Sequence, residues 1–205
     1  MAVRTNVYID GFNLYYGVIK GSPYRWLDLD KLCRLMLPKN EVGQIKYFTA
    51  IVSARPHDPD QPVRQQTYLR AIRTLPNVSV ILGHFLSHPV MMPRADKPGQ
   101  VRVVRTEEKG SDVNLATHLL WDGVRGDYDI AVVVSNDSDL LEPIKIVREE
   151  LNRRVGILNP HRHPSRELLQ NSDFYKKVRP GVLAMCQFPP VLKDRTGEFH
   201  KPAAW

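Results

Sequence analysis

Short apolar runs alternate with amphipathic segments along most of the chain. Residues 130–134 are five consecutive apolar residues, three of them Val, a pattern typical of a strand buried on both faces of a parallel sheet. Further β-rich runs occupy residues 5–10, 44–53, 78–87 and 153–159, and helical periodicity occupies residues 29–37, 63–75, 113–121 and 140–151. This alternation predicts an α/β fold: a three-layer α/β/α sandwich around a mostly parallel sheet of strand order 3-2-1-4-5.

Two segments depart from this alternation. Residues 88–101 are rich in proline and have no clear period, so we expect an irregular excursion or ribbon there, returning through an edge strand at 101–105. A short element is expected near 182–186. From Pro189 onward Pro, Lys, Asp and Gly dominate, so this tail is expected to be either disordered or held on the surface through Phe199 and Trp205.

The composition is that of an ordinary globular protein with one main domain. No apolar run reaches the roughly 20 residues needed to cross a bilayer, and the first residues lack a signal-peptide pattern. The two cysteines, Cys33 and Cys186, are far apart in sequence and match no metal-binding spacing. We therefore expect a cytoplasmic protein with reduced thiols and no membrane partner.

Opposite charges are segregated along the chain, whose formal net charge is +7. Residues 101–150 hold six Lys or Arg against eleven Asp or Glu, whereas residues 1–100 hold 13 against 7 and residues 151–205 hold 10 against 4. An acidic segment in a basic protein suits a cation-binding centre within a surface that attracts phosphates. Because basic surfaces often reflect solubility alone, charge favours a nucleic-acid partner only slightly.

Acidic side chains stand at the ends of predicted elements. Asp10 ends the first strand, Asp137 and Asp139 follow the fourth, and Asp112 begins a predicted helix. In the predicted strand order the first and fourth strands are neighbours, and their carboxyl ends form the switch point where open α/β sheets bind ligands. Helix capping could account for one of these carboxylates, but the repulsion between the paired ones calls for a cation or a proton. Oxygen ligands without His or Cys suit Mg²⁺ or Mn²⁺.

Three segments resemble the NYN domains of the PIN-like nuclease superfamily, in the DUF88/LabA-like branch. They are YIDGFNLYYG (8–17), EEKGSDVNLATHLL (107–120) and VVVSNDSDLLEPIKIV (132–147), with weaker matches at 155–160 and 171–176. The resemblance implies a PIN-like domain over residues 1–180, followed by a Pro-rich C-terminal extension over residues 181–205.

The resemblance also implies metal-dependent ribonuclease chemistry. It assigns a metal site to the four carboxylates of Asp10, Asp112, Asp137 and Asp139. It further implies Asn13 as a polar partner in the first motif, with Ser135 and Asn136 in support; the family commonly has Gly at the position of Asn136, and Asn tolerates unusual backbone angles. The expected reaction is in-line attack of an activated water on an RNA phosphodiester, with Asp139 as a ligand or a base, leaving a 5′-phosphate.

Basic residues in loops at the same edge of the sheet are predicted to contact the RNA backbone. They are Arg55, Arg105 and Lys109. Either Tyr15 or Tyr16 could stack on a base, although packing in the core is the more frequent role of such a side chain.

Two other functions remain open. The first is a non-catalytic RNA-binding or regulatory module that keeps the acidic cleft, although four retained acidic positions favour an enzyme. The second is a small-molecule phosphohydrolase, in which the first Asp of Asp137-Ser138-Asp139 would attack phosphorus; a four-carboxylate cluster that needs no covalent intermediate argues against it. The oligomeric state, including a homodimer, is not determined by the sequence.

Overall fold

A six-stranded sheet, parallel throughout, forms the centre of the molecule, in the order β3-β2-β1-β6-β7-β8. The computed structural model describes residues 3–205. The strands are β1 (Arg4–Asp10), β2 (Glu41–Thr49), β3 (Val78–Leu82), β6 (Ile130–Val134), β7 (Arg154–Asn159) and β8 (Phe174–Lys177). The mostly parallel sheet is confirmed. Its order departs from the prediction by the added strand β8, which extends the sheet at the β7 edge.

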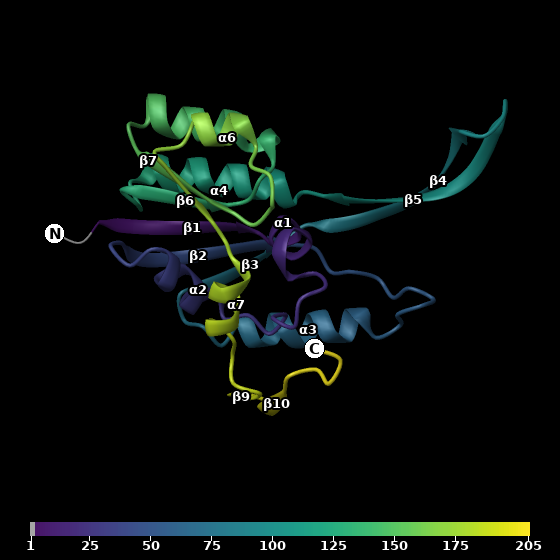
Figure 1. The fold of residues 1–205 in the computed structure, drawn as a ribbon, viewed down its shortest axis with the longest axis horizontal. Coiled ribbons are helices and arrows are strands. Elements are labelled where there is room, and N and C mark those ends of the chain that lie inside the picture. The colour runs from purple at the N-terminus through teal and green to yellow at the C-terminus, as the bar shows by residue number, and fades with distance from the viewer. Residues whose placement is uncertain (1–2) are drawn as a thin grey trace.

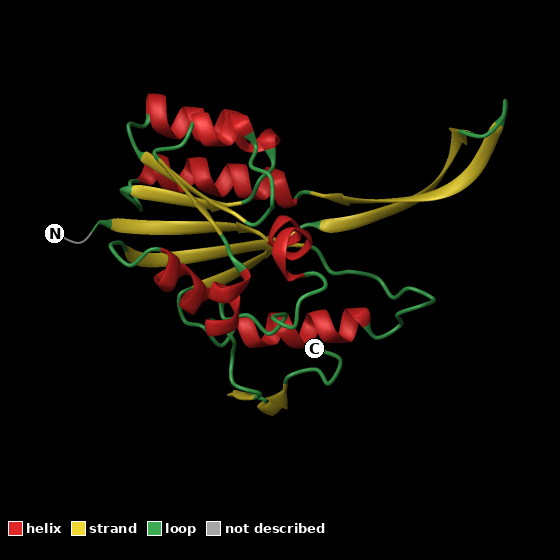
Figure 2. Ribbon diagram, viewed as in Figure 1, coloured by secondary structure: helices red, strands yellow, loops and turns green. Residues whose placement is uncertain are grey.

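Helices cover both faces of this sheet, which confirms the predicted three layers (Figures 1 and 2). One face packs against α1 (Gly11–Leu14), the π-helical turn η1 (Tyr15–Ile19), α2 (Leu29–Met36), α3 (Gln61–Ile72) and α7 (Pro180–Met185). The other packs against α4 (Ser111–Arg125), η2 (Ser138–Leu140), α5 (Leu141–Lys145), η3 (Ile146–Glu150) and α6 (Arg166–Gln170).

Side chains of the central strands alternate between two cores. On β1, Val7 and Ile9 point into the core shared with α2 and α3, whereas Tyr8 points into the core shared with α4. All five residues of β6 are buried, as expected of a strand covered on both faces. Each fully buried aliphatic side chain contributes roughly 1.5–3 kcal/mol to folding, so the two central strands anchor the acidic edge firmly.

A long antiparallel arm leaves the sheet where the sequence predicted one strand and an irregular segment. β3 ends at Leu82, and β4 (His84–Pro93) pairs with β5 (Gln100–Lys109) to form a separate ribbon that projects from the body (Figure 1). The predicted strand at 78–87 is therefore split. A reason is Gly83, where a Cβ would lie 2.5 Å from Glu108 Oε1 and from the Lys109 carbonyl, so only glycine permits this close crossing. The predicted edge strand at 101–105 belongs to the arm instead.

The C-terminal residues pack on the α2 and α3 side of the body. The predicted element near 182–186 is helix α7, and β9 (Val191–Asp194) pairs with β10 (Gly197–His200). The ring of Trp26 is fully buried and packs edge-on against Phe188 at 5.8 Å and Trp205 at 6.3 Å. Arg70 of α3 binds Asp194 at 2.7 Å. The tail is thus held on the surface, whereas the boundary at residue 180 stays a prediction.

Within residues 3–205, every helix is too short or too polar to cross a bilayer.

Candidate carboxylate site at the edge of the sheet

Asp10 lies at the end of β1 and is almost completely buried, with 5% of its surface exposed. Its Oδ1 accepts a hydrogen bond from the backbone N–H of Asn13 at 2.9 Å, so it caps α1. Its Oδ2 accepts from Ser135 Oγ at 3.1 Å. Capping therefore uses one oxygen, and the other faces the loop that follows β6.

The loop after β6 is held in place by side chains that the sequence had singled out. Ser135 Oγ accepts from the backbone N–H of Asp137 at 3.1 Å, and Asn13 Oδ1 accepts from the backbone N–H of Asn136 at 2.9 Å. Asp137 in turn caps η2 by accepting from the N–H of Asp139 at 3.0 Å. These bonds join the first and third motifs into one unit.

Asn136, predicted as a supporting residue, forms hydrogen bonds to the loop at residues 163–165. Its Oδ1 accepts from the N–H of Ser165 at 2.7 Å and its Nδ2 donates to the carbonyl of His163 at 3.1 Å. Within residues 3–205, Asn152 is the one non-glycine residue with positive φ. The side chain of Asn136 therefore connects the loop after β6 to the loop at residues 163–165. Its backbone does not adopt a positive φ, so glycine is not required at this position.

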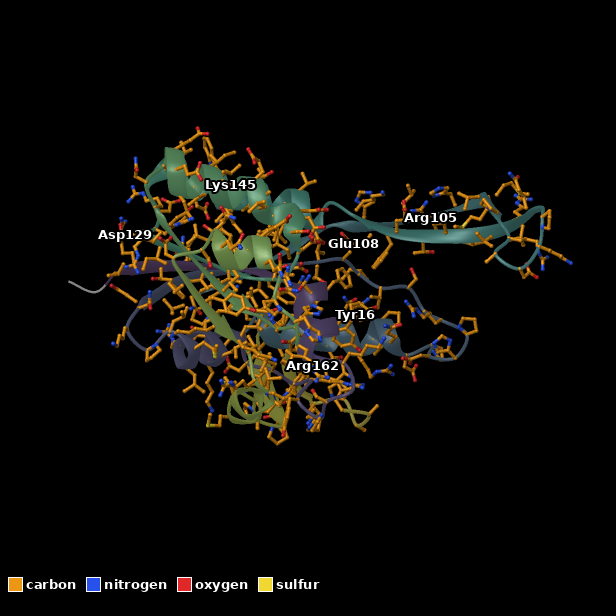
Figure 3. All side chains as sticks on the ribbon, turned by 45° about the horizontal axis from the view of Figure 1, so that its top comes forward. Tyr16, Arg105, Glu108, Asp129, Lys145 and Arg162 are labelled. Carbon is orange, nitrogen blue, oxygen red and sulfur yellow. The ribbon has the colours of Figure 1, made fainter. Side chains whose placement is uncertain are left out.

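Asp112 enters this edge from the first turn of α4, directly after Gly110, whose φ of 94° favours glycine. Reduced solvation raises the pKa of Asp112, and the charges of Asp137, Glu108 and Asp139 raise it further. Glu108, at the base of the arm (Figure 3), was not among the predicted site residues. It accepts from Ser111 Oγ at 2.7 Å, and its position four residues before Asp112 was the available sequence signal.

Several carboxylates lie near one another at this edge, without enough positive charge nearby to balance them. Burial raises the pKa of Asp10 to about 6, and the charges of Asp112 and Asp137 add to the rise against the hydrogen bonds from Asn13 and Ser135. Within residues 3–205, none of the four predicted carboxylates forms an ion pair with Lys, Arg or His. A cation from solution is therefore the natural complement to this cluster.

The donor chemistry fits a hard divalent ion, although the carboxylates do not form a closed cage. In the part of the chain that the structure describes, no three His, Cys, Asp or Glu side chains are grouped tightly enough to hold a metal ion by themselves. Mg²⁺ usually keeps several waters and uses one or two carboxylates together with substrate phosphates. The oxygen set around Asp10, Asp112 and Asp137 suits such an open site.

The basic residues predicted to contact RNA are dispersed around the acidic edge. Arg105 and Lys109 lie on β5 of the arm (Figure 3 labels Arg105). Both form ion pairs with Glu107, and the ammonium of Lys109 lies 3.0 Å from that carboxylate. Arg55 is exposed in the loop before α3, where its backbone bridges to that of Asp58. Any role of these side chains in RNA binding stays a prediction.

An open parallel sheet with carboxylates at the carboxyl ends of its two central strands has the arrangement of a PIN-like, nuclease-like fold. The chain belongs to the NYN domain family, which it matches over residues 4–178. The family membership predicted from three sequence segments is therefore confirmed.

Two individual proteins are similar to this chain. The curated relative 6-hydroxy-3-succinoylpyridine 3-monooxygenase HspA of Pseudomonas putida is 30% identical over an alignment that covers 99% of this chain and 75% of that protein. A crystal structure of a protein of unknown function from Vibrio parahaemolyticus superposes with a TM-score of 0.58 at 19% identity, covering 87% of this chain and 94% of that one. The second similarity concerns the fold alone.

Proposed function

We propose that this protein is a divalent-metal-dependent ribonuclease that cleaves RNA phosphodiester bonds at the acidic edge of the sheet. The observation that carries the proposal is the buried carboxylate of Asp10, whose hydrogen-bond donors among residues 3–205 are neutral and whose neighbours are acidic. Membership of a nuclease-like family supports the same conclusion.

Each side chain has a distinct task in this proposal. One or two of the carboxylates of Asp10, Asp112 and Asp137 would hold Mg²⁺ or Mn²⁺ together with waters and a substrate phosphate, and Asp139, which is exposed, would act as a further ligand or accept a proton. When bound, the ion supplies positive charge for the developing phosphoryl oxygens and lowers the pKa of water. Asn13 and Ser135 hold Asp10 and the loop after β6 in register, so the carboxylates stay oriented without substrate.

The decisive experiment is cleavage of end-labelled RNA and DNA oligonucleotides across a Mn²⁺ titration. We expect Asp137→Asn to lower the rate of RNA cleavage at least about 100-fold, the usual scale for removing a positioned catalytic group. The matched control is Asp127→Asn, because Asp127 is exposed and pairs with Arg125 away from the site. Undiminished cleavage by the Asp137 variant would remove the site assignment. RNA binding without any cleavage by the wild type would favour a regulatory module.

A second candidate is an enzyme that acts on a small aromatic molecule. The named reaction of the Pseudomonas putida relative concerns a substituted pyridine, and the observation here that favours this candidate is a cavity lined by aromatic side chains next to Asp10. The same cleavage assay separates the two candidates, because a wild-type enzyme that acts only on small molecules would leave the oligonucleotides intact at every metal concentration.

A further inference from the structure

A cavity of about 120 Å³ lies beside the carboxylate site, on the α3 side of α1. Its lining comes from α1 and η1, from the loop between η1 and α2, from the end of β2, from the loop before α3 and the first turns of α3, and from Trp205. Gly11, the residue after Asp10, forms part of its wall. The cavity therefore adjoins the acidic edge without sharing its carboxylates.

Six aromatic rings line the cavity. They belong to Phe12, Tyr15, Tyr16, Tyr47, Tyr68 and Trp205. Two of them are fixed in place by contacts: Tyr68 donates its hydroxyl to the carbonyl of Leu27 at 2.9 Å, and its ring packs against that of Trp205 at 5.9 Å. Rings of this kind favour edge-to-face and offset contacts with another ring. A cavity of about 150 Å³ is known to admit benzene, so a cavity of about 120 Å³ that is partly open to solvent is close in size to a single aromatic ring.

The polar groups of the wall leave one cation without a partner. Arg64 binds both carboxylate oxygens of Asp58 at 2.5 Å, and the amide of Gln65 is used by the backbone of Ala50 and Val52. Arg25 is partly buried, and among residues 3–205 its guanidinium forms neither a hydrogen bond nor an ion pair. Five N–H donors at a sheltered site suit a carboxylate or a phosphate.

We propose that this cavity binds a one-ring aromatic molecule that carries a negative charge, with the ring among the aromatic side chains and the anionic group on Arg25. A free aromatic acid and a pyrimidine nucleotide share this chemistry. This proposal specifies a ligand class for the second candidate function above. It depends on the cavity alone and not on phosphodiester cleavage.

Calorimetric titration of the full chain with four probes tests the proposal. Benzoate and benzamide have the same ring and differ in charge, acetate has the charge without the ring, and uridine 5′-monophosphate represents the nucleotide source. We expect benzoate to bind about tenfold more tightly than benzamide, the scale of one charge-assisted hydrogen bond, and acetate to show no saturable binding. Tighter binding of uridine 5′-monophosphate than of benzoate would identify a nucleotide as the source.

Two variants and a control complete the test. Arg25→Gln should abolish the preference for benzoate over benzamide, whereas Arg73→Gln, at an exposed position outside the cavity lining, should keep it. Tyr16→Ala removes a half-exposed ring at the cavity and should weaken both probes. Equal binding of benzoate and benzamide by the wild type, or an unchanged preference in the Arg25 variant, would overturn the proposal. Asp137→Asn should bind benzoate normally, so a failed cleavage assay and a failed binding assay remain distinguishable.

Discussion

Two carboxylates, Asp10 and Asp122, are buried to almost the same extent, with 5% and 4% of their surfaces exposed, yet one lacks the cationic partner that the other has. Asp122 binds the ammonium of Lys46 at 2.6 Å and accepts from the Tyr8 hydroxyl at 2.7 Å. In the described part of the chain, the donors to Asp10 are one backbone N–H and one serine hydroxyl, and Asp112 lies near enough to raise the pKa of Asp10. Burying a charge costs free energy unless it is paired. The charge of Asp122 is compensated by Lys46, whereas the charge of Asp10 has no such partner among the described residues.

The two sites use the same elements, which makes the difference informative. β1 supplies Tyr8 to one site and Asp10 to the other, and α4 supplies Asp122 and Asp112. A general shortage of basic residues cannot explain the unpaired cluster, because the chain carries a formal net charge of +7. Within residues 3–205, the basic side chains that form ion pairs do so with other carboxylates, and none pairs with Asp10, Asp112, Asp137 or Asp139.

The largest effect on stability is expected at the paired site. Lys46→Met leaves Asp122 buried without its cation, so the free energy of unfolding should fall by about 3–5 kcal/mol. Urea denaturation measures this loss. Lys39→Met, at an exposed lysine outside the ion pairs of residues 3–205, should change it by less than about 0.5 kcal/mol. A loss below 1 kcal/mol in the Lys46 variant would mean that the pair is not needed to hold Asp122.

Neutralising the unpaired carboxylate of Asp10 should raise the free energy of unfolding, whereas removing Lys46 lowers it. Asp10→Asn keeps an oxygen that can accept from Asn13 and an amide that can donate to Ser135, and it removes the buried charge. In the absence of divalent ions at pH 7, we expect it to raise the free energy of unfolding by roughly 1–3 kcal/mol. Asp60→Asn, at an exposed aspartate, is the control. Added Mn²⁺ should stabilise the wild type and not the Asp10 variant, so the difference between their free energies of unfolding should become smaller.

The dependence of stability on pH follows from the same carboxylate. Because the pKa of Asp10 is raised from 3.8 to about 6 by burial, the folded protein retains a proton that the unfolded chain has lost between these values. The contribution of Asp10 to stability is therefore fully present below about pH 4 and is lost as the pH rises through 6. Thermal unfolding in chelator from pH 4 to 7 should show this fall in the wild type, superimposed on the titration of other groups. A difference between wild type and Asp10→Asn that is constant with pH would contradict the assignment.

The smallest effect is expected at the arm. Arg105 and Lys109 already pair with Glu107 at exposed positions, so their combined replacement by Gln should weaken RNA binding only about two- to fivefold. RNA affinity should fall steeply with salt, and the double variant should lower that slope by about 1 to 2. Arg195→Gln, an exposed substitution in the tail, serves as the control. A flat salt response of the wild type would count against phosphate-led binding.

The central sheet was predictable because buried parallel strands appear in the sequence as apolar runs, and the run at 130–134 is fully buried. The grouping of Asp10 with Asp137 followed from the same fact, since neighbouring parallel strands end at one edge. Edge elements carry weaker signals. β8 is only four residues, FYKK, and is partly exposed, so its place in the sheet depends on pairing with β7 that the sequence pattern does not contain.

The arm and the cavity were beyond sequence reasoning for a different reason: both depend on contacts between distant residues. Gly83 permits a crossing against Glu108 and Lys109 that is visible only in three dimensions. The cavity is lined by Tyr15 and Tyr16 but also by Trp205. A tyrosine pair after the first motif was the available hint, and it does not distinguish core packing from a ligand site.

The position of Trp205 in the wall of the aromatic cavity gives the docked tail a thermodynamic meaning. Its ring contacts Tyr68 and Trp26 while it lines the cavity, so the proposed ligand would contact the C-terminal tail, and its binding would be coupled to any local unfolding of that tail. Reciprocity then requires that occupancy of the cavity protect the tail from proteolysis and amide exchange, and that releasing the tail lower ligand affinity by the same factor.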